Sequence, residues 1–196
     1  MLAAASVGIF CLRFARKSCS NIPKERIIPM ELRTFFLQQL ERETAANRKA
    51  LERVPQGKNS WKPHERSMEL GYLAALVASM PAWISMMIQT DELNLDKPES
   101  QRFRPSPQDS TAGLLKLADE SKAAAESALK STNEGHLGKL WKFVMGGKAV
   151  NEAPRSEQIA DVFTHMAHHR GQLTVYLRLN EAKVPAIYGP SADERF

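Results

Sequence analysis

The chain has 196 residues, 43% of them hydrophobic and 25% charged, which is the composition of an ordinary globular domain. Its formal net charge of +5 gathers near the start, because residues 1–29 hold five basic side chains and one acidic side chain. The rest of the chain is nearly neutral, whereas a nucleic-acid-binding surface needs a clustered excess of Lys and Arg. The sequence therefore predicts no nucleic-acid partner.

Residues 1–29 also contain both cysteines, Cys11 and Cys19, and we expect this segment to lie outside a domain that spans residues 30–196. Its apolar run of about 11 residues is shorter than the roughly 20 that a membrane-spanning helix needs. It is interpreted as a disordered extension, an organelle-targeting segment or a mis-called start before Met30, with the last reading favoured. The sequence predicts a cytoplasmic protein that does not associate with membranes.

The first helix is expected to begin near Met30 and to end before Pro55, because apolar residues recur at helical spacing between them. A second helix is expected over residues 68–90, and it is apolar on nearly every face, which predicts burial at the centre of the fold. Pro81 lies within this helix and lacks a backbone donor. We expect it to kink or break the helix.

Residues 91–108 are polar and contain three prolines, which predicts an extended connection. Asp109 is expected to cap a third helix that runs to Lys130. The Gly146–Gly147 pair predicts a tight turn, either in a short hairpin or in a helical turn, and residues 156–181 form the fourth helix. Four long helices without alternating strand patterns predict an all-α four-helix bundle, in which the long connection is able to cross over.

Three of the five histidines lie close together in the fourth predicted helix, at positions 165, 168 and 169. Because residues four apart share a helix face, His165 and His169 can direct their imidazoles at one point. Two imidazoles are half of a site for zinc or nickel, which takes three or four ligands. The alternative is a hydrogen-bonded structural pair. A zincin-type protease is excluded, since Met166 stands where its catalytic glutamate would be.

Several segments together resemble the DinB-like proteins, which are distinct from the DNA polymerase of similar name. The resemblance runs from about Met30 to the end and rests on WKPHERSMELGYLAALVASMPAW, LWKF, HMAHHRGQLTVYLRL and VPAIYGPSADE. It implies a four-helix bundle, often homodimeric, and in many members a divalent metal held by three histidines beside a cavity. Some relatives transfer or isomerise low-molecular-weight thiols.

Two of those three ligand positions correspond to His165 and His169, and the third corresponds to Leu76, which cannot ligate a metal. The resemblance therefore implies an incomplete site. Residues that have a suitable chemistry to replace the missing ligand are His168, His64, His136 and Asp161. None of them has the expected spacing.

Other prominent side chains are interpreted as structural. Aromatic residues are expected to fill the core and pocket walls: Trp61, Trp83, Trp141 and Tyr176. Arg170 and Arg178 are interpreted as surface or interface ion-pair partners. Gln172 either orients His168 or is a plain surface amide.

Two functions remain open. In the first, His165, His169 and an unidentified ligand hold zinc or nickel in a metal-dependent transferase or hydrolase. In the second, the bundle is a non-catalytic module that binds a small molecule or a partner, and Leu76 seals a vestigial metal site. A homodimer is expected from the resemblance and from the second helix, which is apolar all round.

Overall fold

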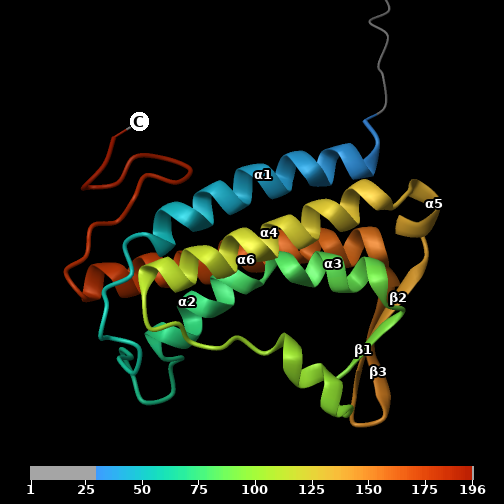
Figure 1. The fold of residues 1–196 in the computed structure, drawn as a ribbon, viewed down its shortest axis with the longest axis horizontal. Helices are drawn as coiled ribbons and strands as arrows, with labels where there is room; N and C mark the ends of the chain where they lie inside the picture. Colours follow the sequence, from blue (N-terminus) through green and yellow to red (C-terminus); the bar gives the residue numbers. More distant parts are fainter. Residues whose placement is uncertain (1–29, 196) are drawn as a thin grey trace, which may run out of the picture.

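The computed structural model describes residues 30–195, and the predictions for residues 1–29 lie outside the described residues. The fold is mostly helical, as predicted, and its helical segments pack against one another along most of the molecule (Figure 1). The helices are α1 (Leu32–Leu51), α2 (Leu70–Ser79), α3 (Pro81–Gln89), α4 (Thr111–Ser131), the short α5 (Glu134–Leu137) and α6 (Arg155–Leu179).

A small sheet at one end of the molecule corrects the prediction of a purely helical fold. Its strands, in the order β1-β2-β3, are β1 (Glu92–Asn94), β2 (Leu140–Met145) and β3 (Lys148–Pro154). β2 and β3 form an antiparallel hairpin and β1 pairs with β2 in parallel. Gly146 and Gly147 make the turn with φ of +61° and +70°, a backbone conformation that favours glycine. The hairpin alternative is therefore the correct one.

Pro81 breaks the second predicted helix into α2 and α3, whose axes differ by 50°. Since proline has no backbone N–H, the carbonyl of Val77, four residues earlier, loses its helical partner. The side-chain amide of Asn47 on α1 donates to this carbonyl at 3.1 Å. The break is thus satisfied by a buried polar side chain from a neighbouring helix.

The connection between α3 and α4 is more structured than predicted. It contains β1 and a 3-10 helix, η1 (Pro98–Phe103), which lie along one side of α2 and α3 (Figure 1). The carboxylate of Asp96 accepts hydrogen bonds from the backbone N–H groups of Gly146 and Gly147, at 3.0 and 2.8 Å. Ser110, rather than Asp109, caps α4 by accepting from the N–H of Gly113.

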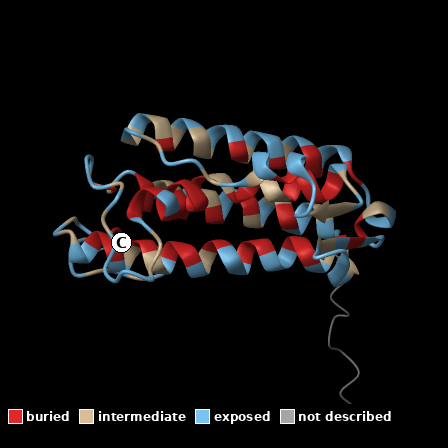
Figure 2. Ribbon diagram, turned by 90° about the horizontal axis from the view of Figure 1, so that it is seen from below, coloured by how far each residue is buried: buried red, intermediate tan, exposed pale blue. Residues whose placement is uncertain are grey.

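Buried residues line the inner faces of the long helices, and α2 and α3 are buried on nearly all sides by the other helices (Figure 2). This fits the central position predicted for the segment, and it also means that no second chain is needed to cover it. No single helix in residues 30–195 is long and apolar enough to cross a membrane, although the bent pair of α2 and α3 reaches that length and composition together.

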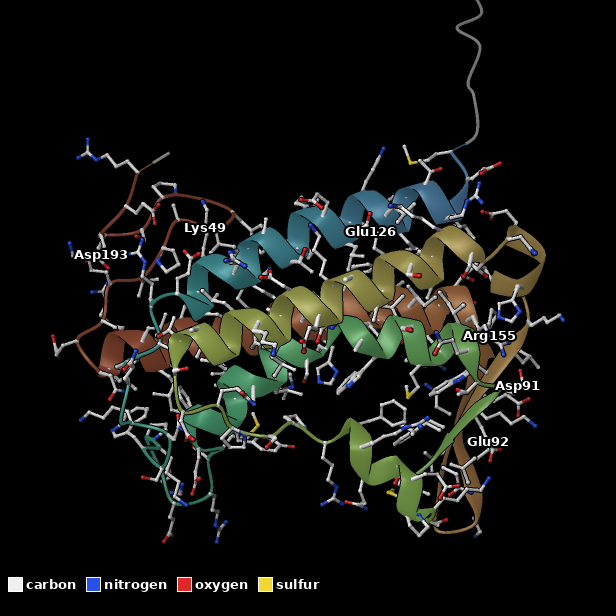
Figure 3. All side chains as sticks on the ribbon, in the orientation of Figure 1. Lys49, Asp91, Glu92, Glu126, Arg155 and Asp193 are labelled. Carbon is white, nitrogen blue, oxygen red and sulfur yellow. The ribbon has the colours of Figure 1, made fainter. Side chains whose placement is uncertain are left out.

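Arg155, the first residue of α6, ties this helix to the end of α3 and to the start of β2. Its side chain is 1% exposed, and its guanidinium donates to the backbone carbonyls of Met87, Thr90 and Leu140 at 2.9, 2.9 and 3.0 Å. It also contacts the exposed carboxylate of Asp91 (Figure 3). One buried cation is therefore stabilised mainly by carbonyl oxygens from two distant segments.

The residues after α6 fold back toward α1 (Figure 1). Within this tail the carboxylates of Asp193 and Glu194 accept from the backbone N–H groups of Val184 and Ala186, at 2.8 and 3.0 Å. Asp193 also pairs with Arg178 on α6. These contacts give the VPAIYGPSADE segment a structural role.

Candidate functional site

A cavity of about 650 Å³ lies between α2, α3, α6, the sheet and the connection that carries η1. Its walls are mainly apolar. The large apolar side chains that line it include Trp83, Trp141, Phe103, Phe143, Met86, Met87 and Leu76. Its volume falls within the range of about 300–1,000 Å³ that is typical of small-molecule sites. Two of the three tryptophans thus form pocket walls, as predicted.

His165 and His169 both project from α6 into the wall of this cavity. Their Nε2 atoms are 2.8 Å apart, and the ring of Trp83 lies 5.6 Å from that of His165 between centroids. Leu76, which the resemblance aligns with a third ligand, lines the same cavity and is 6% exposed. The structure therefore brings together the three positions that the resemblance aligned.

Gln172 connects this pair to His168. Its Oε1 lies 2.8 Å from Nδ1 of His169, and its Nε2 lies 3.0 Å from Nε2 of His168. With the contact between the two Nε2 atoms, these contacts form one continuous hydrogen-bonded chain from His165 through His169 and Gln172 to the exposed His168.

The environment of the cavity keeps the paired imidazoles neutral. Burial is the largest cause that lowers the pKa of His165 below its ordinary 6.5, and repulsion by His169 and His168 lowers it further. Burial also lowers the pKa of His169, and repulsion by His168 adds to this, although the hydrogen bond with Gln172 opposes both. At pH 7 the two rings therefore offer hydrogen bonds and lone pairs, not charge.

Two imidazoles fall short of the three or four ligands that zinc takes in proteins. In residues 30–195 no group of three or more His, Cys, Asp or Glu side chains is placed to hold a metal ion. The donor set does not fit zinc or nickel without a further ligand. Metal binding by His165 and His169 remains a prediction.

The candidate replacement ligands have separate environments. His64 is exposed and its Nδ1 accepts from the N–H of Arg66, while Nε2 of His136 is bonded to the carbonyl of Ile88. Asp161 lines the cavity one turn before His165. His168 lies next to His169, with 5.0 Å between the ring centroids, and it does not line the cavity.

Arg170 is buried, which corrects its interpretation as a surface or interface residue. Its guanidinium donates to the carboxylate of Glu43 at 2.7 Å and to the side-chain oxygen of Asn47 at 2.8 Å. Tyr188, from the C-terminal tail, donates to the same Glu43 carboxylate at 2.6 Å. This network, which is buried at Glu43, Asn47 and Arg170, connects α1, α6 and the tail, and the sequence offered no periodic signal for it.

Gln158 and Asn151, which the sequence did not single out, form a polar part of the cavity wall. Gln158 lies on the same face of α6 as His165, two turns earlier. Its spacing from the histidines was a signal that pointed to the shared face.

Comparisons with known proteins agree on one family. The model of the DinB family matches residues 30–195. The fold is similar to that of a DinB-like protein from Bacillus cereus, with a TM-score of 0.60 and 21% identity over 78% of this chain and 95% of that one. A DinB-like protein from Bacillus subtilis gives a TM-score of 0.57 and 17% identity over 76% of this chain and 93% of that one. No curated protein matches the sequence significantly. The chain belongs to the DinB family.

Proposed function

We propose that the protein binds a small, largely apolar molecule in the cavity beside His165 and His169. The observation that carries this proposal is the cavity itself, about 650 Å³ in volume, with Leu76 completing an apolar wall where the resemblance implies a third metal ligand. Apolar walls with a few converging polar groups are the usual chemistry of a small-molecule site. The neutral imidazoles provide such polar groups.

A fluorescent probe tests this function directly. N-phenyl-1-naphthylamine, an uncharged probe that fluoresces strongly in apolar surroundings, is expected to bind the parent protein with saturation. Val162→Phe places a larger side chain on the cavity wall of α6 and should weaken this binding at least about tenfold, because it occupies ligand volume. The measurement is a fluorescence titration.

Val175→Phe is the matched control, since Val175 lies on the same helix but is 57% exposed. It should leave probe affinity unchanged. Circular dichroism verifies that both variants keep their helices. An unsaturable signal in the parent, or equal binding to both variants, would show that the probe does not report on this cavity.

A metal-dependent transferase or hydrolase is the second candidate function. It is favoured by the convergence of the Nε2 atoms of His165 and His169, which lie 2.8 Å apart in the wall of the cavity. In this reading His165 and His169 bind zinc or nickel with a ligand that is not yet identified. A metal titration of the parent protein separates the two candidates, because only the metal-dependent enzyme requires tight binding of one equivalent.

We also propose a homodimer. This proposal rests on the resemblance alone, because α2 and α3 are covered within one chain and therefore do not indicate a dimer interface. Sedimentation equilibrium at high micromolar concentration should give about twice the chain mass of 21.9 kDa. A single species of one chain mass under these conditions would be evidence against the dimer.

A further inference from the structure

The segment of residues 97–107, which contains η1, forms part of the cavity wall and is attached to the rest of the molecule mainly at its two ends. Among the described residues, its hydrogen bonds reach no further than residues 92–108. Just before it, Asp96 is bonded to the hairpin turn, and just after it the backbone carbonyl of Gln108 accepts from the side-chain amide of Asn59 at 3.0 Å. The segment can therefore move without breaking a hydrogen bond to the long helices.

Little of this segment is buried. Ser100 is 5% exposed and Phe103 and Pro105 are half-buried, while the remaining side chains of the segment are exposed. Phe103 is its one large apolar side chain, and it packs against the main core and lines the cavity. Segments with few buried apolar contacts open locally at a low cost in free energy. Opening here requires mainly the release of one aromatic side chain.

The internal structure of the segment makes it stiff. Proline fixes φ, and the segment has proline at positions 98, 105 and 107, with the 3-10 helix between the first two. The hydroxyl of Ser100 also donates to the carbonyl of Lys97 at 2.7 Å. We therefore expect the segment to move as one piece about its two ends.

The opening of the cavity lies beside this segment. Lining residues that are exposed include Tyr72 on α2, Asp161 and His165 on α6, and Arg104 at the end of η1. Movement of the segment away from α6 would thus widen the opening, and movement toward α6 would narrow it.

We propose that residues 97–107 form a lid that opens and closes the cavity as one piece, held at Asp96 and Gln108 and kept shut by Phe103. This inference rests on the proposed small-molecule function and adds the step that admits and releases the ligand. Lids of this kind often limit the rate at which ligands leave a site.

Thiol labelling measures the opening without any ligand. Ser100→Cys and Ser121→Cys are compared in full-length protein that carries Cys11→Ser and Cys19→Ser, because Ser100 in the lid and Ser121 on α4 are both 5% exposed. N-ethylmaleimide should modify the thiol at position 100 at least about 100-fold faster than the thiol at position 121, since only the first is exposed by a local opening. Mass spectrometry follows both reactions.

Two variants weaken the closed lid at different points. Phe103→Ala should speed labelling at position 100 about fivefold, the effect of losing roughly half the stabilisation of a buried Phe, and should leave position 121 unchanged. Phe35→Ala, at a 40% exposed position of α1, is the matched control and should change neither rate. Asp96→Asn removes an acceptor for the hairpin turn and should also speed labelling at position 100. Because Asp96 does not line the cavity, its effect must act through the lid.

Release of the fluorescent probe tests whether this movement controls access. Asp96→Asn should raise the rate at which bound N-phenyl-1-naphthylamine leaves the protein by about fivefold, the change expected for one net hydrogen bond. Stopped-flow dilution measures this rate, and Phe35→Ala should leave it unchanged.

The outcomes separate the lid from the function on which it rests. Equal labelling at positions 100 and 121, or labelling at position 100 that neither Phe103→Ala nor Asp96→Asn changes, would show that the segment does not open locally. A probe that binds the parent but leaves Asp96→Asn at the parental rate would overturn the lid and leave the small-molecule function intact. If the probe does not bind the parent, the proposed function fails, and the gating role of the lid fails with it.

Discussion

Leu76→His is expected to raise the affinity of the protein for nickel or zinc by more than about 100-fold. The new imidazole would join His165 and His169 in the same cavity wall and complete a three-ligand set with an open position. Loss of a mere outer-shell partner already costs about 10- to 100-fold in metal affinity, so a directly bound ligand should contribute more. Isothermal titration calorimetry on protein prepared without an affinity tag measures the effect.

The same variant should lose stability without metal, because it replaces a buried aliphatic group by a polar one that has no partner. Added metal should restore the melting temperature by binding the folded state preferentially. Val150→His adds a histidine at an exposed site of β3 and is the control. Equal metal affinity in Leu76→His and Val150→His would refute the alignment of Leu76 with the third ligand. Tight binding of one equivalent of metal by the parent protein would instead support the metal-dependent enzyme.

Arg170→Met is expected to destabilise the protein by about 3–5 kcal/mol, the usual cost of removing one partner of a buried ion pair. The side chains of Arg170 and Glu43 are 2% and 4% exposed, so the remaining carboxylate would stay buried without a counter-charge. Asn47 would lose a partner as well. Urea denaturation followed by circular dichroism measures the change in the free energy of unfolding.

Two further variants test whether the buried ion pair is the source of this loss of stability. Arg48→Met removes exposed ion pairs with Asp119 and Glu52 and should cost less than about 1 kcal/mol. The double variant Glu43→Leu with Arg170→Met removes both buried charges and should recover part of the stability. A double variant as unstable as the sum of the two single variants would contradict the ion-pair explanation.

Acid should weaken the same network. Burial alone would raise the pKa of Glu43, but hydrogen bonds from Tyr188 and Arg170, with the charge of Arg170, outweigh it and hold the pKa below 4.5. The stability from this carboxylate is therefore complete above pH 4.5 and is lost as the pH falls through the lower folded-state pKa. The difference in stability between the parent and Arg170→Met should shrink over that range.

Periodicity predicted the helices well because their apolar faces are set by local sequence. The break at Pro81 followed from the chemistry of one residue, and His165 and His169 share a wall because helix geometry places residues four apart together. The hairpin of β2 and β3 was one of two alternatives, but β1 was missed because it is three residues long and pairs with a strand that lies almost fifty residues away. No local pattern reports such a pairing.

The roles of buried polar residues also could not be predicted from the sequence. Arg155 and Arg170 look like surface cations because arginine is seldom fully buried, and only their partners reveal their role. Those partners are carbonyl oxygens for Arg155 and the carboxylate of Glu43 for Arg170. Gln158 was overlooked although its spacing from His165 places both residues on one face of α6, because an amide on that face does not by itself indicate a cavity.

The contacts of Arg155 impose an order on assembly. Its carbonyl partners come from residues 87–90 and 139–140, segments about fifty residues apart, and its own helix begins fifteen residues after the second one. Its hydrogen bonds form only after the chain has closed both loops, and closing long loops is what slows folding. Replacing Arg155 is therefore expected to release the end of α3 and the start of β2 from α6, so that the end of the molecule with the sheet and one wall of the cavity opens locally before the rest unfolds.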